Sequence, residues 1–152
     1  MKTDFKIHTI ESAPEASKPL LERAKKQNGM ISNLFGVMAA APGLLEGYMQ
    51  LHRLFDESSF DAEEKTVIWQ TLNVENDCHY CVPAHTVIAN MMQVDPALTE
   101  AEIAAFYAVG YTHRQLLEVV LGLAQKVMSN YTNHIADTPL DQAFAQAAWK
   151  KK

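Results

Sequence analysis

The spacing of apolar residues is the feature that most restricts the fold of this chain of 152 residues. Apolar side chains recur mostly at intervals of three and four, the period of a helix that buries one face. No Asn-Gly or Asp-Gly pair is flanked by alternating apolar residues, so the usual signal of a β-hairpin is missing. The pattern therefore predicts an all-α fold.

Capping residues and prolines divide this pattern into helices. Pro19 is expected to split the first helix, and Pro42 fits the first turn of the third. Asp61 and Asp77 are expected to cap the fourth and fifth helices, and Thr112 the long helix near the end. We expect helices over about residues 14–27, 31–40, 43–54, 62–72, 78–92, 99–110, 113–134 and 140–149.

The bulk properties predict one cytoplasmic domain over residues 1–152. The formal charge is −5, and the longest basic run is the terminal Lys150–Lys152, so a nucleic-acid-binding face is not expected. The chain begins without an apolar signal segment. Its longest apolar stretch, 116–127, is interrupted by Glu118, Gln125 and Lys126, so a membrane span is not expected.

The two cysteines carry the clearest chemical signal. Cys78 and Cys81 are separated by two residues, which is too close to staple distant parts of a secreted fold and suits redox work instead. On a helix, Cys78, Cys81 and His85 share one face because they stand at relative positions 0, 3 and 7. A helix N-terminus and a nearby histidine both favour a thiolate over a thiol.

A dithiol of this kind supports a peroxidase cycle without cofactor or metal. A thiolate attacks a hydroperoxide to give a sulfenic acid, which the second cysteine converts to a disulfide. Pro83 lacks the amide hydrogen that a regular helix would use there, so we expect an irregular first turn that leaves Cys78 free to move.

Three segments resemble a known family. They are residues 28–35 (NGMISNLF), 41–45 (APGLL) and 76–86 (NDCHYCVPAHT), the last with histidine four residues after the second cysteine. The chain resembles the carboxymuconolactone decarboxylase superfamily, in particular its alkylhydroperoxidase D-like branch. The resemblance implies an oligomeric all-helical fold, a homotrimer or homohexamer, and thiol-dependent peroxidase or disulfide-reductase activity.

The resemblance also implies roles for individual residues. Cys81 corresponds to the peroxidatic thiol, Cys78 to the resolving thiol, and His85 to the histidine that assists proton transfer. The substrate would be a hydroperoxide or a disulfide, and the reductant a thioredoxin-like or lipoyl-bearing protein.

Two positions differ from the family pattern. Thr66 stands where the family has its relay glutamate, twelve residues before the first cysteine, and Tyr80 stands at the family's histidine between the cysteines. Glu63, Glu64 and Glu75 are the candidates to replace that glutamate, and Glu75 is favoured because it is three residues from Cys78.

Other interpretations remain open at this stage. The chain could be a decarboxylase-like enzyme acting on a small carboxylated ring compound, which would need an arginine from among Arg23, Arg53 and Arg114. It could also be a non-enzymatic scaffold that binds zinc or senses redox state, or its cysteines could be ordinary core residues. A polar group of Tyr131, Asn133 and His134 could approach the dithiol or simply cap its helix.

Overall fold

The computed structural model describes residues 5–91 and 113–150, and all regular elements among them are helices. This confirms the predicted all-α class. In chain order the elements are η1 (Glu15–Ser17), α1 (Lys18–Asn28), α2 (Asn33–Met38), α3 (Pro42–Asp56), α4 (Ala62–Glu75), α5 (Cys81–Met91), α7 (His113–Ala136) and η2 (Gln142–Ala147).

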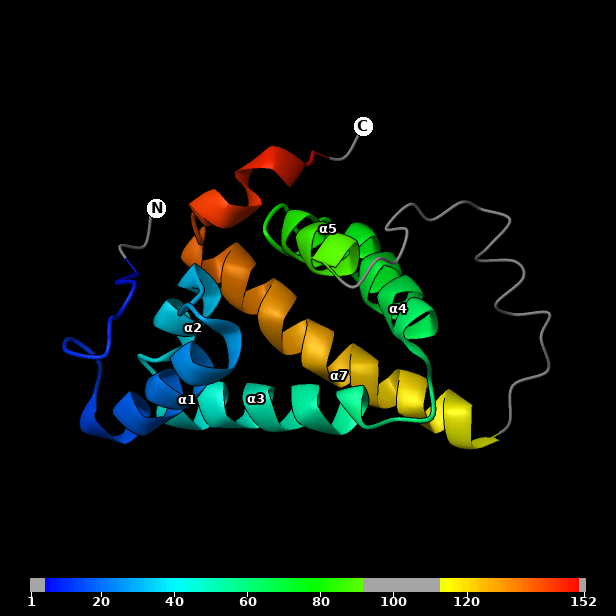
Figure 1. Cartoon of the computed structure of the whole chain (residues 1–152), viewed down its shortest axis with the longest axis horizontal. Coiled ribbons are helices and arrows are strands. Elements are labelled where there is room, and N and C mark those ends of the chain that lie inside the picture. Colours follow the sequence, from blue (N-terminus) through cyan, green and yellow to red (C-terminus); the bar gives the residue numbers. More distant parts are fainter. Residues whose placement is uncertain (1–4, 92–112, 151–152) are drawn as a thin grey trace.

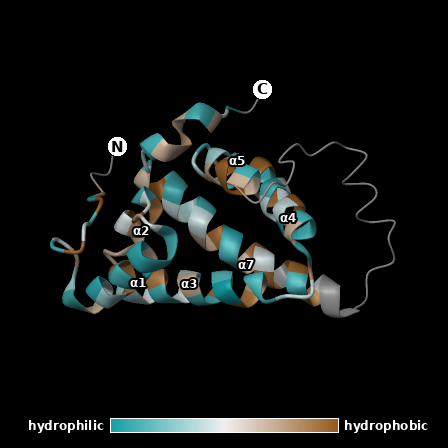
Figure 2. Cartoon of the chain, in the orientation of Figure 1, coloured by the Kyte–Doolittle hydropathy of each residue, from teal (hydrophilic) through white to brown (hydrophobic). Residues whose placement is uncertain are grey.

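The long helix α7 organises the other elements (Figure 1). It packs against α2 and α3 on one side and against α4 on the other, while α5 packs on α4 and η2 packs on α5. Figure 2 shows that hydrophilic and hydrophobic residues both occur along α7. The helix is therefore central in position without being uniformly apolar.

Two clusters of buried side chains form the core. The first joins α1, α2 and α3 to the segment around the cysteines, with Leu21, Met38 and Leu45 beside Cys78 and Cys81. The second contains Phe55, Phe60, Ile68 and Trp69, where α3, α4 and the loop between them meet. The dithiol thus belongs to the apolar core and not to a surface loop.

Most of the expected helix starts are confirmed. Pro19 and Pro42 lie in the first turns of α1 and α3, where a missing amide hydrogen removes no helical hydrogen bond. The 3-10 turn η1 precedes α1, as a split first helix requires. Asp61 caps α4 in a reciprocal capping box with Glu64.

The prediction that Asp77 caps the fifth helix is wrong. Helix α4 continues to Glu75, past the expected break at Asn73, and Asp77 follows its end with a positive φ of 50°. The Cys78 amide donates back to the Asn73 carbonyl, which closes the end of α4. Asp77 therefore ends one helix, because aspartate tolerates left-handed backbone, and α5 begins only at Cys81.

The predicted α-helix over 140–149 is also wrong. The chain forms only the 3-10 segment η2 there, with the bonds Phe144 N–H to Asp141 O and Ala148 N–H to Ala145 O. Asp141, just before this segment, is held by hydrogen bonds from the Asn33 amide and from the Tyr80 hydroxyl. Phe144 packs against Tyr80 and Trp149 packs against His79 of the same chain.

Some expectations fall on parts of the chain that are not described. The predicted helix over 99–110, its capping box and the Thr112 cap lie outside the described residues. Within residues 5–91 and 113–150, no helix combines the length and apolar character needed to cross a bilayer.

The close approach of α3 and α7 generates a stability prediction. A Cβ added to Gly122 would lie 2.7 Å from the ring of Phe55, which is fully buried, whereas a Cβ added to Gly47 meets only Met128 Cε at 3.5 Å. We expect Gly122→Ala to destabilise the protein by about 1–3 kcal/mol through overpacking. The matched Gly47→Ala should be neutral or stabilise by up to about 1 kcal/mol through helix propensity.

Urea denaturation of both variants checks this prediction. Equal midpoints for the two would contradict the packing of Phe55 against α7.

Candidate functional site

The two cysteines lie in contact at the junction between α4 and α5. Cys78 belongs to the turn that follows α4, and Cys81 is the first residue of α5. Both are free cysteines, almost completely buried, with their Sγ atoms 2.6 Å apart. The Cys78 sulfur also accepts a hydrogen bond of 3.2 Å from the Cys81 amide. A disulfide, with its S–S bond of about 2.05 Å, could form with little backbone movement.

The turn before α5 explains how Pro83 is accommodated. Val82 N–H donates to Cys78 O and Ala84 N–H donates to Tyr80 O, so the bonds on both sides of Pro83 are made. Pro83 itself lies in the first turn of α5, where proline is tolerated. Residues 78–80 are not helical and α5 begins at Cys81, so Cys78 lies outside the helix that carries Cys81 and His85; that Cys78 is free to move stays a prediction.

Polar side chains from α7 reach the sulfurs. Asn133 Nδ2 lies 3.2 Å from Cys81 Sγ and 3.9 Å from Cys78 Sγ, and the residue is buried. One helical turn earlier, Asn130 donates to the side chain of Asn73 at 3.2 Å and accepts from that of Asn76 at 2.8 Å. Amide donors thus face the sulfurs from the α7 side.

A second set of contacts holds α5 on α4. Asn73 Nδ2 donates to Cys81 O at 3.3 Å, and Gln70 Nε2 donates to Val82 O at 3.3 Å and to Thr86 Oγ1 at 3.0 Å. The carbonyls at the start of α5 are therefore fixed by side chains of α4. This bonding sets where the Cys81 side chain points.

A buried lysine and histidine form the third part of the site. Lys126, on α7, is completely buried, and its Nζ lies 2.9 Å from Nε2 of His85. The His85 ring also packs on Trp69, with ring centroids 5.1 Å apart. Among the described residues no hydrogen bond joins His85 to either sulfur; its partner is Lys126, whose charge lowers the pKa of Cys81.

The surroundings make the two sulfurs electrostatically different. Burial raises the pKa of Cys81, but the hydrogen bond from Cys78, the charge of Lys126 and the amides of Asn130 and Asn133 together lower it below the ordinary thiol value. The pKa of Cys78 is raised, first by its hydrogen bond to Cys81 and then by burial. Cys81 is therefore the thiolate and Cys78 the thiol that donates to it.

Tyr80 has a structural role beside the dithiol. Its hydroxyl donates to Asp141 Oδ2 at 2.5 Å and accepts from the amide of Leu34 at 3.3 Å. Burial, followed by the Asp141 carboxylate, raises the pKa of Tyr80, so it stays protonated at neutral pH. Tyr80 thus ties the chain around Asp141 to α2 and to the cysteine turn.

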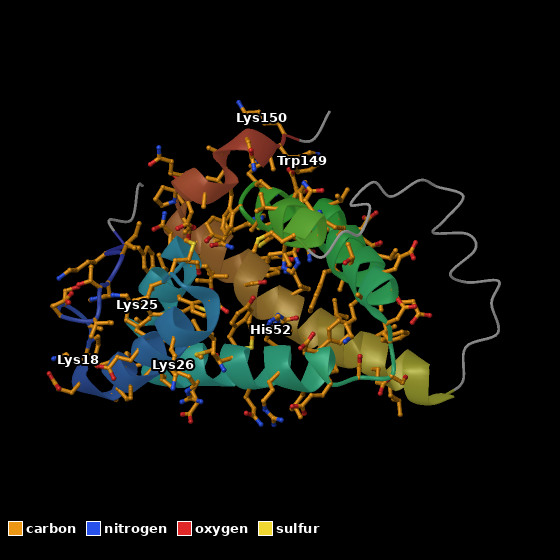
Figure 3. The ribbon with its side chains drawn as sticks, in the orientation of Figure 1. Lys18, Lys25, Lys26, His52, Trp149 and Lys150 are labelled. Atoms are coloured by element: carbon orange, nitrogen blue, oxygen red, sulfur yellow. The ribbon has the colours of Figure 1, made fainter. Side chains whose placement is uncertain are left out.

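A surface pocket of about 320 Å³ opens beside Cys78. Its walls are the turn Asp77–Tyr80 and the end of α7 with the residues that follow it, including Asn133, His134 and Asp137. Trp149 packs against His79 with ring centroids 5.8 Å apart, and Figure 3 shows it near α5. Cys78 lines this pocket and Cys81 does not.

The glutamates proposed as relay groups do not meet at the dithiol. Glu75 and Glu63 are exposed, and Glu64 serves the capping box of α4. Thr66 is buried and its hydroxyl donates to Ala62 O within the same helix. A relay role for Glu75 stays a prediction to which its exposed position lends no support.

Of the polar group at the end of α7, only Asn133 reaches the sulfurs. Tyr131 and His134 are exposed and stack on each other, with ring centroids 6.4 Å apart.

Lys126 and the amides of Gln70, Asn73 and Asn130 were missed as site residues by the sequence analysis. One signal was present, because Gln125 and Lys126 interrupt an otherwise apolar helix. Both are completely buried, and Gln125 bonds to Trp69, Tyr48 and His52. Figure 3 shows His52 between α3 and α7. Polar residues within an apolar helix can therefore indicate a buried polar contact, and not only a face exposed to solvent.

The comparisons with known proteins identify the fold. The structure is similar to that of a protein from Ralstonia eutropha JMP134 described as an alkylhydroperoxidase AhpD core and an uncharacterised peroxidase-related protein, with a TM-score of 0.72, 15% identity and 99% of each chain covered. The fold is alkylhydroperoxidase D-like.

A second similar structure is an uncharacterised peroxidase-related protein from Silicibacter sp. TM1040, with a TM-score of 0.72, 14% identity, and 94% of this chain and 93% of that one covered. No protein-family model matches the sequence, and no curated protein matches it. At these identities the likeness establishes the fold, and the function has to be argued from the site.

The contact between Asn133 and Cys81 generates a titration prediction. Asn133→Leu removes the amide donor, so the pKa of Cys81 should rise toward the ordinary value of about 8.5. The thiolate absorbance at 240 nm, followed against pH, should then appear at higher pH than in the wild type. Glu22→Gln, exposed on α1, is the control and should leave the curve unchanged. Superimposable curves for Asn133→Leu and wild type would refute the contact.

Proposed function

We propose that this protein is a thiol-dependent hydroperoxide reductase that cycles Cys78 and Cys81 between dithiol and disulfide. One observation carries the proposal: two free sulfurs lie 2.6 Å apart, and the pKa of one is lowered while that of the other is raised. A peroxidase of this type needs one sulfur as nucleophile and its neighbour as resolving thiol. This asymmetry assigns the nucleophile to Cys81 and the resolving role to Cys78, in agreement with the family resemblance.

The cycle has four steps. The Cys81 thiolate attacks the outer oxygen of the hydroperoxide, which gives Cys81 sulfenic acid and an alkoxide or hydroxide that takes up a proton to become an alcohol or water. The Cys78 thiol then condenses with the sulfenic acid, which forms the disulfide and water. A reductant thiolate attacks Cys78, which lines the pocket, and Cys81 leaves as the thiolate. A second thiol of the reductant displaces Cys78 from the mixed disulfide, which restores the dithiol. A low-pKa leaving thiol such as Cys81 accelerates the third step.

Burial of the dithiol favours small hydroperoxides as substrates. Cys81 is 1% exposed, so a protein disulfide would not reach it without rearrangement of the turn. For the return half of the cycle we propose a thioredoxin-like or lipoyl-bearing protein as electron donor, because its small exposed thiol suits a pocket of about 320 Å³. A dithiol that must return to its reduced state also suits the cytoplasm.

A decarboxylase-like activity has less support from the site. Arg23 is exposed on α1, Arg53 is exposed and paired with Glu57, and the side chain of Arg114 lies outside the described residues. The pocket beside Cys78 carries Asp77 and Asp137, which would repel a carboxylated substrate.

The metal-binding scaffold also lacks a supporting arrangement. In the described part of the chain, no three side chains of His, Cys, Asp or Glu are arranged to hold a metal ion.

We also propose that the protein forms homo-oligomers, trimers or hexamers. Leu123, Val127, Tyr131 and Ile135 are spaced by four residues along α7 and are all exposed, which gives one apolar stripe on the helix. Burying that stripe against a second copy would remove it from water.

The cysteine assignment generates a pair of predictions. After addition of hydrogen peroxide, wild type should lose two titratable thiols per chain. Cys78→Ser should form a sulfenic acid on Cys81 that dimedone traps, because the resolving thiol is gone, and should form no disulfide. Cys81→Ser should react with peroxide at least about a hundredfold more slowly, because burial still raises the pKa of the remaining thiol, Cys78.

Mass spectrometry of the dimedone adduct and thiol titration check both variants. Glu22→Gln, exposed on α1, serves as the control and should behave as wild type. If wild type keeps both thiols after exposure to peroxide, the proposed function is wrong. If the adduct appears on Cys78 in Cys81→Ser at the wild-type rate, the assignment of the two sulfurs is reversed.

A further inference from the structure

Lys126 is completely buried, and among the described residues no carboxylate is one of the groups that shift its pKa. Its Nζ lies 2.9 Å from Nε2 of His85, which is one helical turn after Cys81 on α5. Burial lowers the pKa of Lys126, and the charges of Cys81 and Cys78 oppose that shift. From α3, His52 faces it as a further titratable group. Asp56 and Lys65 act on His52 but are not among the groups that shift the pKa of Lys126. Among the described residues, the Cys81 thiolate is therefore the anion that balances the ammonium group.

Among the described residues, consumption of that thiolate leaves the lysine without a counter-charge. In the disulfide form neither sulfur is charged, and an unpaired ammonium group in a protein interior is strongly destabilised. A lysine in this position becomes a neutral amine instead. His85 does not replace the thiolate as partner, because burial and then Lys126 lower its pKa well below the ordinary value and keep it neutral.

We propose that Lys126 donates the proton that the oxidation step requires, and that it regains this proton when the disulfide is reduced. The inference rests on the proposed peroxidase function for the identity of the proton acceptor. The coupling of Lys126 to the redox state of the dithiol holds for any two-electron oxidant.

The step balances in atoms and charge. The Cys81 thiolate bonds to the outer oxygen of the hydroperoxide and the O–O bond breaks, which releases an alkoxide or hydroxide. The Lys126 ammonium protonates this leaving oxygen and becomes an amine that donates to His85 Nε2. The Cys78 thiol then condenses with the sulfenic acid to give the disulfide and water. With hydrogen peroxide as substrate, two waters form and no proton is exchanged with the solvent.

The proposed role of Lys126 also accounts for the lack of an acidic proton donor beside the sulfurs among the described residues. In the described part of the chain, no carboxylic acid makes a hydrogen bond to either sulfur, and the hydroxyl of Thr66 is bonded to the backbone of its own helix. The buried lysine supplies the proton that a carboxylic acid would otherwise supply.

The experiment compares thiolate content with proton exchange in a single turnover. Reduced wild-type protein is mixed with one equivalent of hydrogen peroxide and a pH indicator in weak buffer. The buffer is set to roughly pH 7.0–7.5, where a low-pKa thiol is ionised. We expect thiolate absorbance at 240 nm before mixing and no net proton uptake during oxidation. Uptake of one proton per chain would show that Lys126 keeps its charge and would overturn the proposal.

Two substitutions assign the effect to Lys126. Lys126→Arg keeps a positive charge that arginine cannot release, so the thiolate should remain, one proton per chain should come from the solvent, and peroxide reduction should slow by about a hundredfold or more. Lys126→Met removes the charge, so the thiolate absorbance at pH 7 should be lost. Thiolate retained in Lys126→Met, or no proton uptake in Lys126→Arg, would overturn the proposal.

Oxidation by diamide separates this inference from the proposed function. Diamide takes up two electrons and two protons, as hydrogen peroxide does, so the expected proton counts are the same. If peroxide fails to oxidise the wild type but diamide gives no net uptake, the peroxidase function is wrong and the redox-linked lysine stands. Far-ultraviolet circular dichroism shows whether each variant is folded, and the wild-type result decides the proposal where a variant is not.

Discussion

The structure depends on satisfying the polar side chains that α7 carries into the core. Gln125, Lys126, Asn130 and Asn133 are all buried, and a buried polar group without a partner is strongly destabilising. Their partners lie on three other helices. Gln125 bonds to Tyr48 and His52 of α3 and to Trp69 of α4, and Asn130 bonds to Asn73 of α4. On α5, Lys126 contacts His85 and the amide of Asn133 donates to Cys81 Sγ. The packing of α3, α4 and α5 around α7 is therefore fixed by directional contacts as well as by apolar area.

These contacts also set the pKa values of the two cysteine thiols. An apolar core would raise the pKa of both thiols, because burial disfavours the charged form. Here one cation and several amide donors face Cys81, while Cys78 is placed to donate to it. The same arrangement that satisfies α7 therefore separates the pKa values of the two sulfurs, lowered at Cys81 and raised at Cys78. A fold shared at 14–15% identity does not by itself require that separation.

The sequence predicted those features of the fold that depend on interactions between residues close together in the chain. Proline in the first turns of α1 and α3, and the Asp61–Glu64 capping box, act over a few residues and were placed correctly. The prediction that Asp77 is an N-cap failed because aspartate is common both as a helix N-cap and in left-handed backbone after a helix. The hydrogen bond from Cys78 N–H to Asn73 O, which closes the end of α4, places Asp77 in the second position. The prediction of a last α-helix failed because Asp141 and Phe144 are held by their contacts with Tyr80.

The sequence by itself determined the helical class and the pair of cysteines, because helical periodicity and residue spacing are properties of neighbours along the chain. Only the tertiary structure decided which sulfur is the thiolate, since Lys126 and Asn133 are more than forty residues from Cys81 in sequence and in contact with its surroundings in space. Coulombic and hydrogen-bonding interactions depend on distance in three dimensions. The role of a lysine that interrupts an apolar helix can be inferred only from the side chains that surround it in the folded protein.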